Sequence, residues 1–422
     1  MNSQRESLTR AIGTVGLAAG IVNIMIGGGI FRAPALVAGP LGAAAPVAYV
    51  ICAIAMALIV TCIAAAGRRV TLTGGPYAYV GTTLGPYAGF ISGVLLWMIG
   101  VFATAAVSSV MAASIGELVP ALSGRARNAL VLVAAFSFWS LINLRGVSLG
   151  VRLNTAITIA KLMPLLLIAV AGMFFLRGEN LRVAEWPAAG DFARMSLILV
   201  FAFAGIEVAL IPSGEVRDSE RTVPRAIALA MISVTILYIA LQVVAQGILG
   251  PALPASAVPL ADAAGGSLGA WGRSLLLAGA AISMFGHLGG MTLSIPRIVY
   301  ALARDGYLPR ALAAVHPIHR SPQLAIITQW ILTLALAITS TFEQLAVIAN
   351  VSALALYLGC AAAAWRLGQS PIVPALACGV IAWLLTGVKP DEWLAFGACV
   401  GIASIVYAIR RPAIDSSVPA QS

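Results

Sequence analysis

Apolar stretches of about 20 residues recur along the whole chain, and they constrain the fold more than any other feature. A helix of that length crosses a bilayer with all of its backbone groups paired. Only 9% of the 422 residues are charged and 60% are hydrophobic, whereas soluble proteins have about 25% charged residues. The strict polar and apolar alternation of β-barrel strands is missing. We therefore predict an all-α integral membrane protein.

The hydropathy pattern predicts twelve transmembrane helices. They cover approximately residues 13–38, 43–66, 86–115, 128–144, 151–176, 193–212, 225–249, 272–302, 323–341, 344–366, 371–388 and 392–410. Basic residues in loops set the orientation of such a chain. Of the 25 basic residues, sixteen lie in loops on one side, seven lie on the other, and two lie within spans. This predicts that both termini, residues 1–12 and 411–422, are cytoplasmic, in a multi-pass protein of the cell membrane.

Two of these spans contain helix-breaking residues. Residues 27–29 are three consecutive glycines, with Pro34 after them, and Gly205 with Pro212 interrupts the sixth span. Each glycine costs about 1 kcal/mol relative to Ala in a helix. A helix that opens in mid-membrane exposes N–H and C=O groups, and paired interruptions of this kind are typical of a transporter's substrate site. Alternatively, the glycines only let helices pack closely.

Three ionisable residues are predicted at membrane depth: Arg32, Lys161 and Glu207. Such a charge costs at least about 2.5 kcal/mol on insertion scales, so it is usually functional. Lys161 is one of only two lysines, and a buried lysine can lose its proton. We predict that Lys161 and Glu207 serve proton coupling, that Glu207 also contacts substrate, and that Arg32 belongs to a vestibule or gate. Alternatively, Lys161 and Arg32 only extend towards the interface, and Glu207 is a neutral structural hydrogen bonder.

Other chemistry is not supported by the sequence. The five cysteines and three histidines lack the spacing of a metal site, so no metal and no cofactor are predicted. The G-x-S-x-G pattern at residues 146–150 lies in a helix connection without the strand or the histidine that an enzyme of that type needs. The net charge of +10 follows the loops, so we expect a lipid bilayer and no nucleic acid as partner, and no enzymatic activity.

Five segments, in order, carry a resemblance to a known superfamily. They are Gly-Gly-Gly-Ile-Phe with Pro34, residues 74–97 starting Gly-Gly-Pro-Tyr, Lys161 with Pro164, residues 201–227, and residues 297–309. With these motifs the chain resembles the amino acid–polyamine–organocation superfamily of transporters. The resemblance implies a leucine-transporter-like fold. Residues 13–177 and 193–366 would form two inverted repeats of five helices, and residues 371–410 would add two further helices.

The resemblance also implies which residues bind an amino acid. The groups that would meet its carboxylate are Gly28, Gly29 and Ile30. The groups that would meet its amino group are Met25, Ile26, Phe201, Ala202 and Ala204. Phe201 would also act as an aromatic gate, and the apolar residues that would line the side-chain pocket are Val101 and Met291. Helix N-termini favour anions and unwound carbonyls favour cations, which agrees with this assignment. Gly28 stands where many members have Ser or Ala.

We therefore predict a secondary active transporter that takes up neutral, apolar amino acids with protons by alternating access. One alternative is an exchanger of amino acids or polyamines that needs no proton. Another, of a different class, is a membrane sensor that binds amino acids without transporting them. The sequence leaves the particular substrate, the stoichiometry and the oligomeric state open.

Overall fold

The computed structural model describes residues 13–69, 76–145, 162–205, 219–316 and 321–415. Every regular element within these ranges is a helix. Seven of the described helices are long and apolar enough to cross a membrane, and three shorter apolar helices accompany them. All twelve predicted ranges overlap a described helix. The class of all-helical membrane protein is confirmed, while the arrangement in two inverted repeats stays a prediction.

The described part of the chain contains fourteen α-helical segments. In chain order they are α1 (Thr14–Met25), α2 (Gly29–Leu41), α3 (Ala45–Arg69), α4 (Pro76–Leu84), α5 (Pro86–Leu118), α6 (Arg125–Arg145), the helix at Leu162–Phe175, α8 (Ala189–Phe203), α10 (Ser219–Leu249), α11 (Pro259–Arg304), α12 (Gln323–Thr339), α13 (Phe342–Arg366), α14 (Ile372–Leu385) and α15 (Pro390–Asp415).

The connection between α10 and α11 differs from the prediction. The eighth span was expected to begin at residue 272 after a long loop. Instead, the short helix η6 (Gly250–Ala255) is followed by α11, which starts at Pro259. Gly269, with φ 75° and ψ −167°, divides α11 into a short first helix and a long second one. Pro259 has a φ that suits the first turn of a helix, which explains why a helix starts there.

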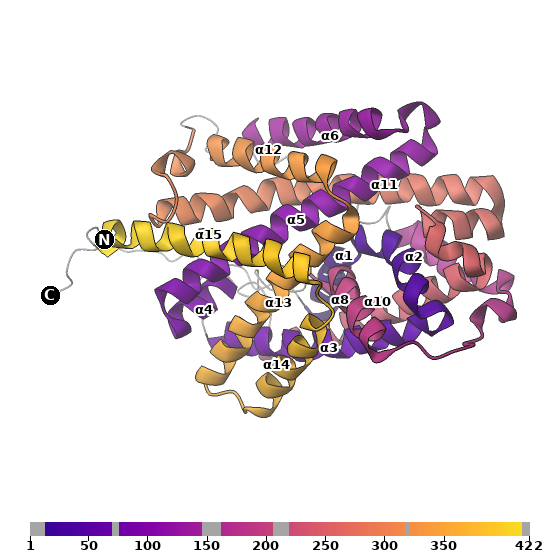
Figure 1. Ribbon diagram of the computed structural model, residues 1–422, viewed down its shortest axis with the longest axis horizontal. Coiled ribbons are helices and arrows are strands. Elements are labelled where there is room, and N and C mark those ends of the chain that lie inside the picture. Colours follow the sequence, from indigo (N-terminus) through magenta and orange to yellow (C-terminus); the bar gives the residue numbers. More distant parts are fainter. Residues whose placement is uncertain (1–12, 70–75, 146–161, 206–218, 317–320, 416–422) are drawn as a thin grey trace.

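α5 lies at the centre of the bundle. It packs against α11 on one side and α13 on another, with α4 and α12 also in contact, and Figure 1 shows it crossing between them. α3 packs against α8, α10, α13 and α14, whereas α1 lies along α10 and α2 lies against α8. The interrupted first helix is therefore enclosed by α5, α8 and α10.

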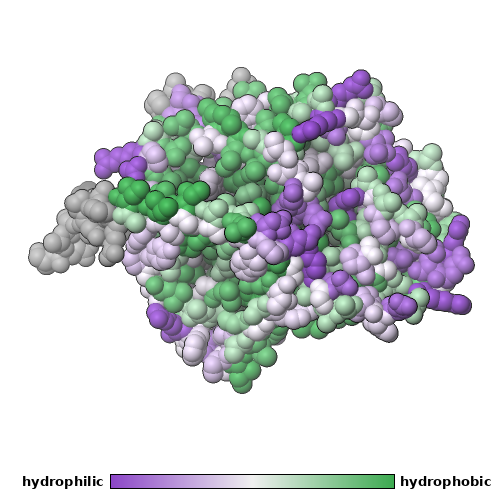
Figure 2. Space-filling view, viewed as in Figure 1, coloured by the Kyte–Doolittle hydropathy of each residue, from purple (hydrophilic) through white to green (hydrophobic). Residues whose placement is uncertain are grey.

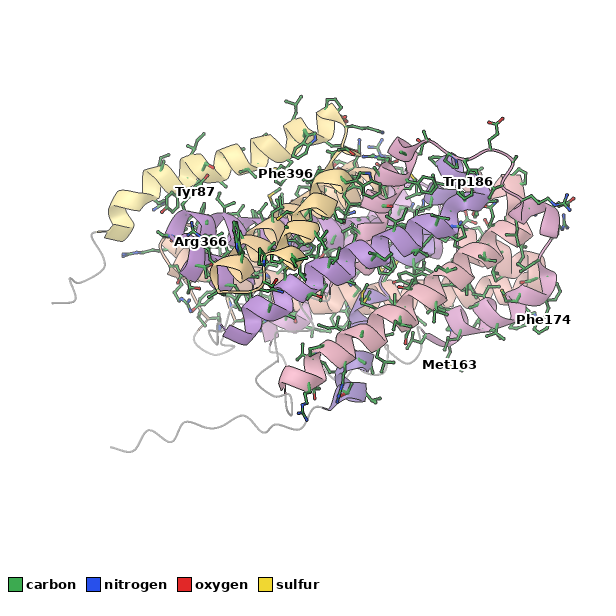
Figure 3. All side chains as sticks on the ribbon, turned by 90° about the horizontal axis from the view of Figure 1, so that it is seen from below. Tyr87, Met163, Phe174, Trp186, Arg366 and Phe396 are labelled. Atoms are coloured by element: carbon green, nitrogen blue, oxygen red, sulfur yellow. The ribbon has the colours of Figure 1, made fainter. Side chains whose placement is uncertain are left out.

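Large apolar side chains also cover the outside of the bundle. Met163 is 66% exposed and Phe174 is 84% exposed, and both point away from the body in Figure 3. Ile402 and Ile405 are exposed along α15, where Figure 2 shows a band of hydrophobic residues. An apolar surface of this extent is rare on a soluble monomer and suits contact with lipid.

Candidate functional site

The first membrane helix is interrupted where the sequence predicted. α1 ends at Met25, Ile26 leaves helical geometry with φ −75° and ψ 78°, and α2 begins at Gly29. α8 ends at Phe203, and Gly205 beyond it has φ +105°, a left-handed conformation that favours glycine. The interruption at residues 27–29 is therefore confirmed, and α8 stops two residues before the glycine that was expected to break it.

The start of α2 lies against the last turn of α8. A Cβ atom added to Gly29 would lie 2.9 Å from Cδ1 of Phe201 and 3.1 Å from Cα of Ala202 in α8. A Cβ atom added to Gly28 would lie 2.9 Å from Cγ1 of Val107 in α5. The glycines thus let the start of α2 approach α5 and the backbone of α8. Both interpretations of the glycine run hold, because it marks a break and also permits close packing.

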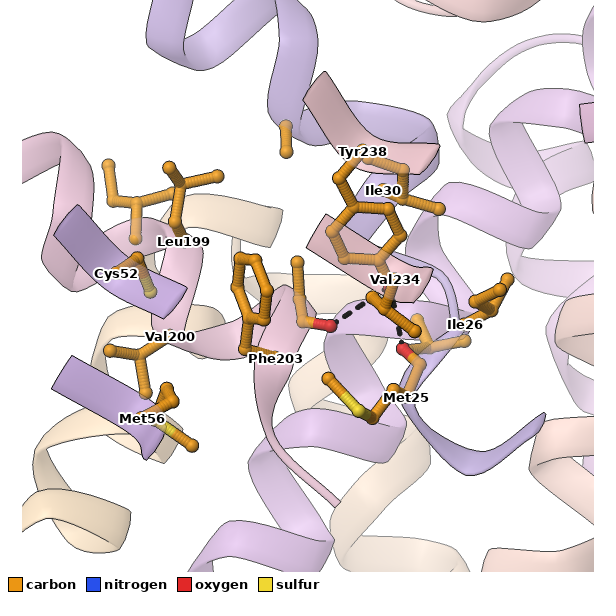
Figure 4. Packing of buried hydrophobic residues seen from close by; sticks show 14 of the residues in the cluster. Met25, Ile26, Ile30, Cys52, Met56, Leu199, Val200, Phe203, Val234 and Tyr238 are labelled. Atoms are coloured by element: carbon orange, nitrogen blue, oxygen red, sulfur yellow. Dashed lines mark hydrogen bonds between the residues drawn. The ribbon is translucent and has the colours of Figure 1, made fainter. Parts of the chain in front are cut away.

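Backbone groups of opposite polarity meet at this junction. The carbonyl oxygens of Met25, at the end of α1, and of Ala202, near the end of α8, both accept hydrogen bonds from the hydroxyl of Tyr238, at 2.9 and 3.0 Å (Figure 4). Helix C-termini carry partial negative charge, and the N-terminus of α2 carries partial positive charge with N–H groups that lack an intrahelical acceptor. The junction can therefore hold an anionic group at α2 and a cationic group at α1 and α8.

The side chains around the junction are mostly apolar. Ile26 and Ile30 are fully buried, and the ring of Phe201 contacts that of Phe342 edge-to-face, with centroids 5.4 Å apart. One polar ring lies nearby, because Nδ1 of His287 is 4.0 Å from the place of a Cβ on Gly27. The sequence analysis did not select His287. Its place as a histidine within a predicted span was the available signal.

The surroundings of Val101 and Met291, the two residues predicted to line the side-chain pocket, are described in part. Val101 follows Gly100, against which Ile295 of α11 packs closely, whereas Val107 is the α5 residue at the junction. Met291 lines a cavity of about 10 Å³ among α5, α6, α11 and α12, room for about one water molecule. None of the described residues lining that cavity comes from α2 or α8. Their contact with substrate stays a prediction.

Arg32 belongs to a chain of polar contacts at one end of the bundle. Its guanidinium donates a hydrogen bond to the carbonyl oxygen of Ser256, between η6 and α11. The Ser256 hydroxyl donates to Asp262 at 2.6 Å, and Arg273 joins Asp262 at 3.0 Å and Glu117 at 2.6 Å. This chain of contacts connects α2 with α11 and the end of α5, so the connection that the sequence analysis had treated as a loop covers α2.

A second charged cluster fixes the start of α8. Arg194 binds both carboxylate oxygens of Glu392, at 2.6 and 2.7 Å, and it binds Glu343 at 2.8 Å. Bidentate pairs of this kind are strong and directional. The starts of α8, α13 and α15 are thereby held together beside α2. Lys161 and Glu207, the predicted coupling residues, lie outside the described residues.

Comparison with known proteins identifies the family. A family model described as amino acid permease matches residues 12–409. An uncharacterised transporter of Mycobacterium tuberculosis is 34% identical over 224 residues, 51% of this chain and 50% of that protein. A serine/threonine exchanger of Bacillus subtilis is 31% identical over 220 residues, half of each protein. A methylthioribose transporter of the same species is 24% identical over 285 residues, 62% of this chain and 60% of that protein.

In the alignments with the mycobacterial transporter and the serine/threonine exchanger, this chain spans about half the length of the relative. The family model, in contrast, runs almost from end to end, over an all-helical structure with several spans of membrane length. The chain is therefore a multi-pass membrane protein that belongs to the amino acid permease family, within the amino acid–polyamine–organocation superfamily.

Proposed function

We propose that this permease is a secondary active transporter that takes up neutral, apolar amino acids across the cell membrane with protons. The observation that carries the proposal is the meeting of helix ends of opposite polarity at the junction of α1, α2 and α8. An amino acid backbone presents one carboxylate and one ammonium, charges that are opposite to the partial charges of these helix ends. The carboxylate binds the N–H groups of Gly28, Gly29 and Ile30, and the ammonium binds carbonyls of α1 and α8.

Preference for an apolar side chain is supported by the walls of the junction. The described side chains at the break, at the start of α2 and on the facing part of α5 include Ile26, Ile30 and Val107, all buried and aliphatic. A charged substrate side chain placed among them would lose its hydration without a described partner of opposite charge. A neutral, apolar amino acid avoids this cost.

The gate that we propose involves the start of α13. Its first residue, Phe342, contacts Phe201 edge-to-face, and its second, Glu343, binds Arg194 of α8 at 2.8 Å. A movement of the start of α13 would therefore change the covering of α2 and α8 together. Arg32 and Phe201 retain the gate roles that the sequence predicted, as part of this proposal.

Coupling to protons rests on Lys161 and Glu207. The test is accumulation of labelled amino acid in proteoliposomes with an imposed proton gradient, with and without a protonophore. We expect Lys161→Ala to abolish accumulation that depends on the gradient. If Lys161→Ala accumulates substrate as the wild type does, the coupling role is wrong.

An exchanger is the second candidate, because one relative that is 31% identical over half of each chain is named as a serine/threonine exchanger. Proteoliposomes preloaded with unlabelled substrate separate the two mechanisms. An exchanger takes up label only when preloaded, whereas a proton symporter also accumulates label in empty vesicles under a gradient. A sensor would bind ligand and show no flux in either case.

The substrate itself is best sought by thermal shift. A ligand of the folded state raises its stability by about 2.7 kcal/mol at a concentration 100 times its dissociation constant. The panel is the twenty amino acids, common polyamines and methylthioribose, since a relative is named for that sugar. Stabilisation by methylthioribose and by no amino acid would refute the proposal.

A further inference from the structure

The hydroxyl of Tyr238 contacts the C-terminal ends of both α1 and α8. Tyr238 lies in the middle of α10 and is fully buried. Its ring makes edge-to-face contacts with Phe203, with centroids 5.3 Å apart, and with Tyr49, at 6.4 Å. Figure 4 shows the hydroxyl pointing to the ends of α1 and α8. Burial and these two ring contacts therefore restrict the direction of the hydroxyl.

The two acceptors of this hydroxyl are backbone groups at negative helix ends. Met25 is the last residue of α1, and Ala202 is the last but one of α8. Carbonyls in the last turn have no intrahelical donor, and two such ends placed together repel each other. A hydroxyl between them, 2.9 Å from one oxygen and 3.0 Å from the other, lowers that repulsion.

The two carbonyl oxygens together can accept more hydrogen bonds than they receive. Each has two lone pairs, and the oxygen of Met25 also accepts the backbone N–H of Gly27 at 2.8 Å. The Tyr238 hydroxyl has one proton and donates to one of the two oxygens at a time. Gly27 and Tyr238 thus use two of the four lone pairs, and the remaining two can accept from another donor while Tyr238 fixes the separation of the oxygens. An ammonium group, with three N–H bonds and a positive charge, matches that capacity.

We propose that Tyr238 is a positioning residue of the substrate site, which holds the carbonyls of Met25 and Ala202 at the spacing that receives the amino group of the substrate. This inference rests on the proposed function. Tyr238 acts through the backbone of two other helices, because it lies 213 residues from Met25 in α1 and 36 residues from Ala202 in α8.

The variant Tyr238→Phe keeps the ring and removes the hydroxyl. A matched control exists, because Tyr49 is also fully buried and its hydroxyl donates to Oε1 of Gln242 at 3.1 Å. Tyr49→Phe therefore removes one buried phenol hydrogen bond from the same region without touching the helix ends. A loss shared by both variants reports stability, and a loss confined to Tyr238→Phe reports positioning.

The measurement is the preference for an amino group. The labelled substrate is the amino acid that stabilises the wild type most. Its uptake is measured in competition with the same amino acid, unlabelled, and with the 2-hydroxy acid analogue, which keeps the carboxylate and the side chain but lacks the amino group. We expect Tyr238→Phe to raise KM for the amino acid about tenfold, the factor that corresponds to 1.4 kcal/mol, with a smaller change in kcat. The preference of Tyr238→Phe for the amino acid over the hydroxy acid should fall by a similar factor. Tyr49→Phe should keep the wild-type KM and the wild-type preference.

The outcomes separate this inference from the proposed function. If no amino acid binds the wild type, both are wrong. If amino acids bind and Tyr238→Phe retains the wild-type KM and preference, only the role of Tyr238 is wrong. If Tyr238→Phe does not fold, Tyr238→His is tested in its place. Histidine keeps a polar ring, but its N–H reaches less far than the phenol hydroxyl and does not hold the two carbonyls at the same spacing. A folded Tyr238→His with unchanged preference would overturn the inference as well.

Discussion

Alanine at each of the three consecutive glycines has a different expected cost. Gly27 has open space, since the nearest atom to an added Cβ is 4.0 Å away. At Gly28 the added Cβ meets three atoms of Val107 at 2.9 to 3.2 Å, and at Gly29 it meets backbone atoms of Ala202 at 3.1 and 3.3 Å besides the ring of Phe201. Carbon atoms in ordinary contact lie about 3.5–4.0 Å apart.

The magnitudes follow from two opposing terms. None of the three glycines has a positive φ, so alanine gains about 0.4–1 kcal/mol by restricting the unfolded chain. Overpacking costs about 1–3 kcal/mol where neighbours must shift. Gly27→Ala is therefore expected to be neutral or slightly stabilising. Gly29→Ala is expected to destabilise by about 1–2 kcal/mol, because the α8 backbone cannot turn aside as a side chain can.

Gly28→Ala provides a test of the contact itself. The obstacle there is the valine side chain of Val107, which is stiff because its χ1 angle is restricted in a helix. Val107→Ala removes both of its γ carbons. The loss of unfolding free energy in the double variant should be about 1 kcal/mol smaller than the sum of the losses in Gly28→Ala and Val107→Ala, which is a usual coupling energy for residues in contact. The assay is thermal unfolding of purified protein in detergent, with uptake measured in parallel. Equal stability of Gly27→Ala and Gly29→Ala, or strict additivity of the double variant, would refute the reasoning.

Two further predictions concern the charged clusters. Arg194→Gln leaves the buried carboxylate of Glu392 without its bidentate partner, in a pair whose side chains are only 12% and 9% exposed, and should cost about 3 kcal/mol in unfolding experiments. Arg304→Gln, at a pair that is 62% and 30% exposed, is the control and should cost less than about 1 kcal/mol. Arg32→Gln should slow uptake severalfold while lowering the melting temperature less than Arg194→Gln does, and a variant with wild-type uptake would exclude Arg32 from the gate.

The positions of the helices and of the first interruption were predictable, because both depend on local sequence. Long apolar runs indicate spans, and consecutive glycines indicate a break. The side of α5 that faces the break was not predictable. α5 has buried residues all around its circumference, and a helix that is apolar on every side has no amphipathic phase to read. This is why the sequence analysis did not select Val107, the residue that lies against Gly28, while the role of Val101 stays a prediction.

The contacts between distant segments could also not be predicted from the sequence. Arg32 donates a hydrogen bond to a backbone carbonyl 224 residues away. Every residue has a backbone carbonyl, so the residue type at that position does not indicate the contact. Tyr238 is one aromatic residue among aliphatic ones, and the available signal was that a buried phenol hydroxyl needs a partner. The partner itself depends on how three helices pack, which no local pattern records.

The contacts of the two halves of the first helix differ in kind, and this indicates which half moves. α2 packs so closely on α8 that Gly29 has no room for a Cβ atom, and Arg32 ties it to the connection before α11. α8 is in turn held by the bidentate pair of Arg194. The described contacts of α1 are mainly packing along α10, together with the Tyr238 bond at its last residue. Sliding of apolar surfaces in a bilayer costs less than separating buried ion pairs. Within the proposed alternating access, we therefore expect α1 to move about residues 26–28 while α2 stays with α8.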